Sequence, residues 1–341
     1  VEGRGALADA MAGELSLSGL FALEHGIRGD LQDGVHFETY TDERSGIPVY
    51  SFYGGTGYTF PSTVMETLDV VLFHAQDVSH RAYTYKQTLA ATLLAAAGTN
   101  TAVVVLDRPT PLGYMGNHGP LWNQFFPEPI PVIDAFTLGE LARWLVRTRH
   151  LDVDLQVIPA GNWRRHMTWR ETDLPWIPPS PNIPFVDSAV CYACTGILQH
   201  TSISEGRGCC KPFEYVGAPF ADGAAISQQL NSLGLPGVAF REVYFTPAFN
   251  KFAGTLCAGI HLMIRDERRV DALRTSFAIL QAFAIHAAEG FEVTRGFGRW
   301  LDGTDWNVDR LRDLDVEAFL TVAERQCEAF TQSMADDLLY A

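Results

Sequence analysis

Three short apolar runs separated by helical patterns constrain the fold of this chain more than any other feature. The runs are 68–73 (LDVVLF), 102–106 (AVVVL) and the alternating segment 153–157 (VDLQV). Apolar side chains recur at helical spacing in 82–96, between the first two runs, and 137–150 has a helical pattern before the third. This β-α-β-α-β order predicts an α/β domain with a mainly parallel sheet covered by helices on both faces.

Local signals support these elements. The uninterrupted apolar run 68–73 is typical of a strand buried on both faces. Gly98 ends the first helical pattern, and Thr137 with Glu140 forms a capping box that starts the second. Shorter strands are expected within 20–27 and 47–53. The first half of the chain therefore predicts one α/β domain with a mainly parallel sheet.

Charged side chains follow the ends of several predicted strands. In open parallel sheets, ligands bind beyond the carboxyl ends of the strands, so these groups are expected to meet at one edge. They are Glu24 and His25, then Asp77, His80 and Arg81, then Asp107 and Arg108.

Each group also has a structural interpretation, which the residues alone leave open. Glu24 is either a general acid or base or an exposed side chain beside a capping histidine. Asp77 and Arg81 either bind a polar substrate or cap and complement a helix end. For Asp107 and Arg108 the structural role is favoured, with the Asp capping a turn and the Arg either paired to a carboxylate or binding a substrate carboxylate through two nitrogens.

The stretch 201–219 (TSISEGRGCCKPFEYVGAP) combines charge with unusual backbone freedom. Gly206 and Gly208 flank Arg207 and permit a tight path close to a ligand. The segment is therefore interpreted as a loop that shapes a site. The alternative is a structural turn in which Glu205 and Arg207 pair only with each other.

The length of 341 residues exceeds one ordinary hydrophobic core and predicts two domains. The Pro-rich segment 174–184 is incompatible with a helix or central strand, so we place the boundary there, giving domains 1–184 and 185–341. For the second, smaller α+β domain we expect a strand over 256–264, a helix over 270–285 and a final helix over 316–334 packed onto that domain.

The net charge of −15 argues against nucleic acid as a partner, because phosphate binding needs concentrated Lys and Arg. No apolar run approaches the roughly 20 residues that cross a bilayer. Six cysteines are too few and too unevenly placed for a disulfide scaffold, and they do not define the redox compartment.

Several cofactor and nucleophile motifs are absent from the sequence. Cys191 and Cys194 are followed by the adjacent Cys209 and Cys210, which fit zinc geometry poorly, so buried thiols are favoured over a metal site. The glycines at 54, 55 and 57 lack the ending of a phosphate-binding loop, and no serine lies in a G-x-S-x-G setting. We therefore predict no metal and no nucleotide cofactor.

Ordered motifs along nearly the whole chain resemble the exo-β-N-acetylmuramidases of peptidoglycan turnover, the NamZ-type family. The matching stretches are LEHGIRG (23–29), SGIPVYSFYG (45–54), AQDVSHRAYTY (75–85), VVLDRPTPLG (104–113), FTLGELA (136–142), PWIPPSPNIP (175–184), SEGRG with KPFEYVGAP (204–219) and the closing LLY (338–340).

The resemblance implies a Rossmann-like domain, a smaller C-terminal domain and a cleft between them. It also implies a glycoside hydrolase that releases terminal non-reducing N-acetylmuramic acid from cell-wall fragments. The Glu of the EHG motif, the natural catalytic candidate in the family, falls on Glu24. The lactyl carboxylate of the sugar would suit Arg81, Arg108 or Arg207. This substrate favours a periplasmic or secreted location over a cytoplasmic one.

The chain departs from the family pattern at several points. Leu23 replaces a Pro, the segment 199–202 (QHTS) replaces Glu-Gly-Thr-Asn, and Cys209 replaces a Thr. These changes predict altered specificity or lost activity if the replaced Glu and Asn act in catalysis or in recognition of the 2-acetamido group. The family's first strand has no counterpart before Val1, so we expect part of the first domain to be missing.

We therefore expect acid/base catalysis by Glu24, assisted by His25, with Asp77 or Glu205 as the second carboxylate. The separation of the two carboxylates, which distinguishes retaining from inverting chemistry, is left open. Assistance by the acetamido group of the substrate is also left open. A non-catalytic muropeptide-binding protein is the competing hypothesis, and a zinc- or redox-responsive module is the third. The predicted substrate-binding residues are Arg81, Tyr83, Tyr85, Asp107, Arg108, Asn182, Ser204 and Arg207.

Overall fold

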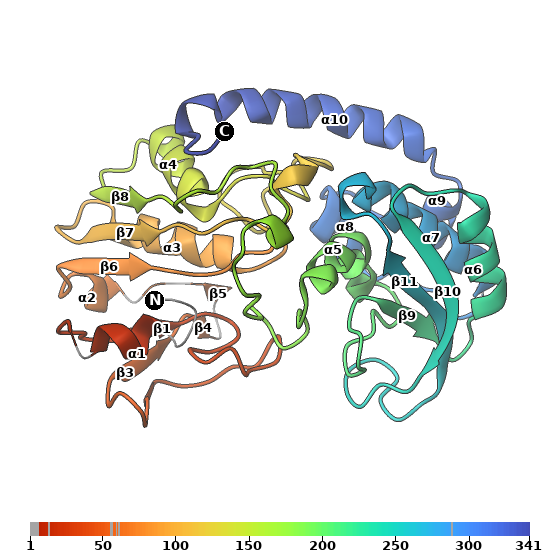
Figure 1. The fold of residues 1–341 in the computed structure, drawn as a ribbon, viewed down its shortest axis with the longest axis horizontal. Coiled ribbons are helices and arrows are strands. Elements are labelled where there is room, and N and C mark those ends of the chain that lie inside the picture. Colours follow the sequence, from red (N-terminus) through yellow and green to blue (C-terminus); the bar gives the residue numbers. More distant parts are fainter. Residues whose placement is uncertain (1–6, 13, 55–56, 59, 61, 288) are drawn as a thin grey trace.

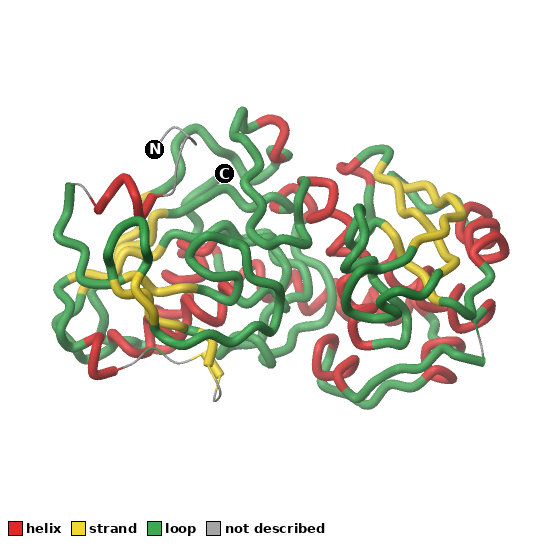
Figure 2. Tube along the Cα trace, turned by 90° about the horizontal axis from the view of Figure 1, so that it is seen from below, coloured by secondary structure: helices red, strands yellow, loops and turns green. Residues whose placement is uncertain are grey.

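The computed structural model describes residues 7–12, 14–54, 57–58, 60, 62–287 and 289–341. Its strands form two main groups, which lie at opposite ends of the molecule with helices and loops between them (Figures 1 and 2). The first group follows the predicted β-α-β-α-β order. Its elements are β6 (Val70–Phe73), α3 (Tyr85–Ala96), β7 (Ala102–Leu106), α4 (Leu138–Arg149) and β8 (Leu155–Ile158).

Strands β6, β7 and β8 form a parallel three-stranded sheet in that order, which confirms the predicted Rossmann-like arrangement. Their register aligns Val71 with Val103, and Val103 with Leu155. Side chains at these positions and two residues further on point to the same face, where α3 and α4 contact the strands and each other. The sheet therefore packs one apolar face against this helix pair.

The prediction that 68–73 is a strand buried on both faces is wrong. The side chains of β6 alternate, so that Val71 and Phe73 are buried while Val70 is 47% exposed and Leu72 is 36% exposed. On the same face, Ile158 of β8 is also exposed. The prediction that helices cover both faces of the sheet is therefore wrong at these positions, where the side chains are exposed. An uninterrupted apolar run does not by itself establish burial on both faces.

The predicted capping box at the start of α4 is confirmed. The Oγ1 atom of Thr137 accepts from the Glu140 N–H at 3.2 Å, and the Glu140 carboxylate accepts from the Thr137 N–H at 3.0 Å. The helix ends at His150, which has a left-handed backbone conformation. This cap defines where α4 begins beside the carboxyl end of β7.

The N-terminal part of the chain forms small sheets of its own. Strand β1 (Leu20–Ala22) pairs in parallel with β3 (Pro48–Ser51), which also pairs with β2 (Tyr40–Thr41). The two-residue strands β4 (Tyr53–Gly54) and β5 (Gly57–Tyr58) form a separate pair, and Gly55 lies outside the described residues. Two short helices, α1 (Leu7–Ala12) and α2 (Ser62–Met65), complete this region.

The second domain contains an antiparallel sheet and several helices. Its strands, in the order β10-β11-β9, are β10 (Val238–Phe245), β11 (Cys257–Ile264) and β9 (Tyr215–Ala218). The strand and helix expected over 256–264 and 270–285 are therefore confirmed. The helices are α5 (Val186–Thr195), α6 (Gly223–Ser232), α7 (Ala272–His286), α8 (Gly296–Leu301), α9 (Val308–Arg312) and α10 (Val316–Ser333).

Helix α10 crosses from the second domain to the first (Figure 1). Phe319, near its start, packs on Phe277 of α7, but Phe330, near its end, packs on Phe136 and Trp144 of the first domain. The prediction that the final helix packs onto the second domain is therefore right only for its first half. The main cluster of buried apolar side chains is continuous through both domains.

Among the described residues, no helix combines the length and apolar character needed to cross a bilayer.

Candidate active site

Glu24 lies just beyond the carboxyl end of β1, on a tight loop. Its Oε2 atom accepts a hydrogen bond of 2.7 Å from the Thr84 hydroxyl, and its Oε1 atom accepts one of 3.2 Å from the Gly34 N–H. The side chain is half-buried. Gly26, with φ of +75°, lets the chain turn directly after the motif. The carboxylate is thus held by neutral donors from two separate segments.

His25 shapes this loop from inside. Its Nδ1 atom lies 2.9 Å from the Leu31 carbonyl oxygen, and the Leu31 N–H donates back to the His25 carbonyl at 3.2 Å. The ring is buried beside Tyr83 and Tyr85. These contacts make His25 a residue that positions the Glu24 loop.

Three of the predicted substrate-binding residues lie around the same loop. The rings of Tyr83 and Tyr85 meet edge to face at 4.8 Å, and burial raises the pKa of both phenols. The Tyr85 hydroxyl donates to the Pro179 carbonyl at 2.7 Å. Asn182, also from the Pro-rich segment, donates to the Gln32 side chain at 2.7 Å. The Pro-rich segment thus packs directly against the loop that carries Glu24.

Asp77 belongs to a buried charge cluster beyond the carboxyl end of β6. Its carboxylate accepts from Lys86 and from the Ser79 N–H, and Lys86 lies 3.3 Å from Asp134. Lys86 and Asp134 are completely buried, and burial raises the pKa of Asp134 to about 6. The Oδ1 atom of Asp77 has no hydrogen-bond partner among the described residues. Lys86 and Asp134 were not predicted as part of the site.

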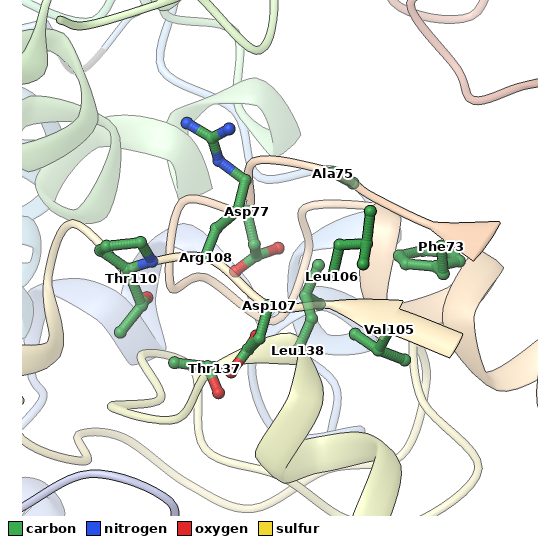
Figure 3. A pocket seen from close by; sticks show the side chains of 11 residues that line it. Phe73, Ala75, Asp77, Val105, Leu106, Asp107, Arg108, Thr110, Thr137 and Leu138 are labelled. Atoms are coloured by element: carbon green, nitrogen blue, oxygen red, sulfur yellow. The ribbon is translucent and has the colours of Figure 1, made fainter. Parts of the chain in front are cut away.

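A small hollow opens at the carboxyl ends of β6 and β7 (Figure 3). Asp77 lines it together with Asp107, Arg108, Thr110 and Thr137. Asp107 accepts from the Gly139 N–H at 2.9 Å and from the Tyr340 hydroxyl at 2.8 Å, so it caps α4 and holds the C-terminal segment. This bonding is the structural role favoured for Asp107, and its role in binding substrate stays a prediction.

Arg108 points away from Asp107 (Figure 3). Its Nε atom donates to Gln76 at 2.7 Å, and its Nη1 atom lies 3.2 Å from Nε2 of His74. The residue is half-buried, and its predicted role in binding substrate stays a prediction.

The prediction of Arg81 as a substrate-binding residue is wrong. Its completely buried guanidinium donates to the backbone carbonyl oxygens of Pro120, Ile130, Trp300 and Leu301 at 2.6–2.7 Å. Burial lowers its pKa to about 9. The neighbouring His80 is also completely buried, between the rings of Tyr192 and Trp300. Both residues hold the two domains together and are inaccessible to a ligand.

The loop 201–219 presents a second buried charge cluster, from the other domain. Glu205 accepts from Arg207 and, at 2.9 Å, from Lys251. Burial acts to raise the pKa of Glu205, but the charges of Lys251 and Arg207 outweigh it and lower this pKa. Glu205 thus remains a carboxylate committed to two cations, and its role as the second carboxylate stays a prediction.

Ser204 also has a structural role. It is buried, its hydroxyl accepts from the Gly206 N–H at 3.2 Å, and its backbone pairs with Gly217. This bonding contradicts its predicted contact with substrate.

The loop with Glu24 and the loop with Arg207 meet at the domain boundary. The Nε atom of Arg207 lies 3.5 Å from Oδ1 of Asp33, which follows Glu24 in the same tight loop. Asp33 and Lys251 were missed in the sequence because their partners lie far away along the chain. The cleft expected between the domains stays a prediction.

Cys191 and Cys194 lie buried in α5, and burial raises the pKa of both thiols. Within the described part of the chain, no group of three or more His, Cys, Asp or Glu side chains could hold a metal ion.

The parallel sheet with polar groups at its strand ends, together with the second, antiparallel-sheet domain, defines the class of a two-domain α/β protein. Two family models cover almost the whole chain: "Exo-beta-N-acetylmuramidase NamZ, N-terminal" matches residues 4–187, and "Exo-beta-N-acetylmuramidase NamZ, C-terminal" matches residues 190–340. The chain belongs to this exo-β-N-acetylmuramidase family.

Similar proteins agree with this family. The chain is 38% identical over 336 residues to the peptidoglycan β-N-acetylmuramidase NamZ of Bacillus subtilis, covering 96% of this chain and 80% of that protein. A crystal structure of a DUF1343 family protein from Bacteroides fragilis superposes with a TM-score of 0.85 at 26% identity, covering 100% of this chain and 92% of that one. A second DUF1343 protein from the same organism has the same fold, with a TM-score of 0.73 at 23% identity and coverage of 97% and 88%.

Proposed function

We propose that this protein is a glycoside hydrolase that releases terminal, non-reducing N-acetylmuramic acid from peptidoglycan fragments. Membership of the exo-β-N-acetylmuramidase family supports this activity, as does the 38% identity to a peptidoglycan β-N-acetylmuramidase. A peptidoglycan-derived saccharide is accordingly the substrate.

We assign Glu24 as the proton-transfer residue because its hydrogen-bond donors are neutral, whereas Asp77 and Glu205 pair with cations. Among the described residues, Asp77 is committed to Lys86 and Glu205 is committed to Arg207 and Lys251. In the described part of the chain, the hydrogen bonds to Glu24 come from a hydroxyl and a backbone N–H, and no cation pairs with it.

In this mechanism, Glu24 donates its proton to the glycosidic oxygen as the bond to the anomeric carbon breaks. The oxygen leaves as a hydroxyl of the shortened fragment. A water molecule then attacks the anomeric carbon and forms the new hydroxyl group there. In doing so it gives up one of its two protons to a carboxylate. We assign Asp77 as the second carboxylate, because it lines the hollow at the carboxyl ends of β6 and β7 and its Oδ1 atom has no hydrogen-bond partner among the described residues.

The test uses two substrates with different leaving groups. A nitrophenyl β-N-acetylmuramide has a leaving group that departs without protonation, whereas the sugar hydroxyl of a muramyl disaccharide requires a proton. We expect Glu24→Gln to reduce kcat/KM on the disaccharide by about 10²–10⁴-fold and to reduce it less on the nitrophenyl glycoside.

Glu38→Gln is the matched control, because Glu38 is an exposed carboxylate in the same region of the chain and should retain full activity. Equal, small effects of both variants would remove Glu24 from the mechanism. Wild-type protein that binds the disaccharide without cleaving it would instead identify a non-catalytic muropeptide-binding protein.

A further inference from the structure

Thr84 occupies the N-cap position of α3, directly before Tyr85. A threonine at this position usually accepts a hydrogen bond from a backbone N–H of the first helical turn, as Thr137 does at the start of α4. Within the part of the chain that the structure describes, the Thr84 side chain makes no capping bond, and its hydroxyl donates to Oε2 of Glu24 at 2.7 Å. The hydroxyl is thus committed to a residue 60 positions away and not to its own helix.

The backbone and the neighbouring rings determine where this hydroxyl lies. Thr84 has helical φ and ψ of −72° and −9°, and its carbonyl oxygen accepts from the Thr88 N–H at 3.1 Å. The rings of Tyr83 and Tyr85, on either side in the sequence, are buried and meet edge to face. These contacts hold the Thr84 backbone in place, so the hydroxyl reaches Glu24 from a fixed point.

The two oxygens of the Glu24 carboxylate have unequal partners. The bond from Thr84 to Oε2 is partly buried, and its 2.7 Å is the usual length for an O–H donor. The bond from the Gly34 N–H to Oε1 is exposed and has a length of 3.2 Å, at the long end of the usual range. Because water competes for an exposed acceptor, the bond at Oε1 is the weaker of the two. A proton that binds to Glu24 therefore goes to Oε1.

We propose that Thr84 is a positioning residue that keeps the transferable proton of Glu24 on Oε1. This role rests on the proposed function, in which Glu24 protonates the glycosidic oxygen. The proton passes from Oε1 to that oxygen, which takes the electron pair of the breaking bond to the anomeric carbon. Glu24 is left as a carboxylate whose Oε2 atom still accepts from Thr84. The Thr84 hydroxyl thus holds the carboxyl group in one orientation before and after the transfer.

Thr84→Val tests this role, because valine keeps the shape of threonine and lacks the hydroxyl. On a muramyl disaccharide we expect kcat to fall roughly 10- to 100-fold, as for the loss of a hydrogen bond to a charged group, with KM changed less than about twofold. On a nitrophenyl β-N-acetylmuramide, whose leaving group needs no proton, the fall should be about threefold or less. Thr84→Ser keeps the hydroxyl and should restore most of the activity.

Thr92→Val is the matched control. Thr92 lies about two turns further along α3, is completely buried, and donates its hydroxyl proton to the Thr88 carbonyl oxygen at 2.8 Å. This variant loses a buried hydroxyl of the same helix without touching Glu24, so kcat and KM should stay at the wild-type values. Circular dichroism shows whether each variant is folded. If Thr84→Val does not fold, the comparison of Thr84→Ala with Thr84→Ser isolates the hydroxyl, because both lack the methyl group.

Equal losses of kcat on the two substrates in Thr84→Val would overturn the positioning role, as would the same loss in Thr84→Ser or Thr92→Val. If kcat on the disaccharide falls in Glu24→Gln but not in Thr84→Val, proton donation by Glu24 stands and the role of Thr84 is contradicted. Wild-type protein that does not hydrolyse the disaccharide, or a fully active Glu24→Gln variant, would contradict the proposed catalysis and with it the role of Thr84.

Discussion

At the scale of single residues, the partners of each carboxylate determine its role, and these partners differ between Glu24 and the buried carboxylates. Asp77, Asp134 and Glu205 each lie against an ammonium or guanidinium group inside the protein. Removing such a cation would leave an unpaired buried charge, which costs several kcal/mol. Asp134 and Glu205 therefore hold structure and orient cations, whereas Glu24 accepts from a hydroxyl and a backbone N–H.

Asp134 makes stability depend on pH. Its folded-state pKa of about 6 exceeds its ordinary value of 3.8, because burial and the neighbouring Asp77 outweigh Lys86 and Arg81. Between these two pH values the folded protein binds more protons than the unfolded chain, so stability falls as pH rises from about 4 to about 6. We expect Asp134→Asn to remove this loss and to stabilise the protein at pH 8 by on the order of 1–3 kcal/mol.

Denaturant unfolding of wild type and variant at pH 4.5 and pH 8 checks this expectation. The exposed Asp152→Asn serves as the control and should follow the wild type at both values. An Asp134→Asn protein that is less stable than the wild type at pH 8 would show that the carboxylate is a net stabilising partner of Lys86.

The sequence identified the motif around Glu24 and the charged pair in the 201–219 loop, but it could not assign tasks to them. Glu205 and Arg207 do pair, as the structural interpretation required. Their third member, Lys251, lies 46 positions from Glu205, and no local spacing indicates it. Burial, which decides whether a charge is available to a ligand, is created by packing of distant segments.

At the scale of elements, the start of α4 lines the hollow that lies at the carboxyl ends of β6 and β7 (Figure 3). Thr137 caps its first turn and lines the hollow. We expect Thr137→Ala to cost about 1 kcal/mol of unfolding free energy, because one N–H at the start of the helix loses its acceptor. Thr137→Ser keeps a hydroxyl and should cost less. Thermal unfolding of the two variants is the measurement, and equal losses would show that the methyl group and not the cap supports stability.

The elements that sequence predicted correctly are those specified locally. The capping box joins residues only three positions apart, and the three strands have compact β-branched runs. The predictions that were wrong concern the surroundings of an element. The exposure of Val70 and Leu72 depends on what covers the sheet, and the two-domain packing of α10 depends on which surfaces it crosses.

At the scale of the whole molecule, the two domains are joined by buried polar contacts as well as by a continuous core. Arg81 lies in the first domain but donates to carbonyl oxygens of Trp300 and Leu301, 219 and 220 positions later. At the surface, Asn117 donates to Thr331 of α10 at 2.8 Å. The site between the Glu24 and Arg207 loops therefore depends on how firmly these contacts hold the domains.

We expect Arg81→Lys to loosen this arrangement. A lysine carries three donors on one atom and cannot reach four carbonyl oxygens placed around a planar guanidinium, so buried acceptors lose their partners at about 1–3 kcal/mol each. The unfolding free energy should fall by roughly 2–5 kcal/mol, and KM should rise because the two halves of the site separate more easily.

The exposed Arg325→Lys on α10 should change neither quantity. Denaturant unfolding followed by both tryptophan fluorescence and circular dichroism measures the stability, and steady-state hydrolysis of a muramyl disaccharide measures KM. A destabilised Arg81→Lys protein with unchanged KM would show that Arg81 stabilises one domain alone. A contact that aligns the two loops cannot weaken without altering the site between them.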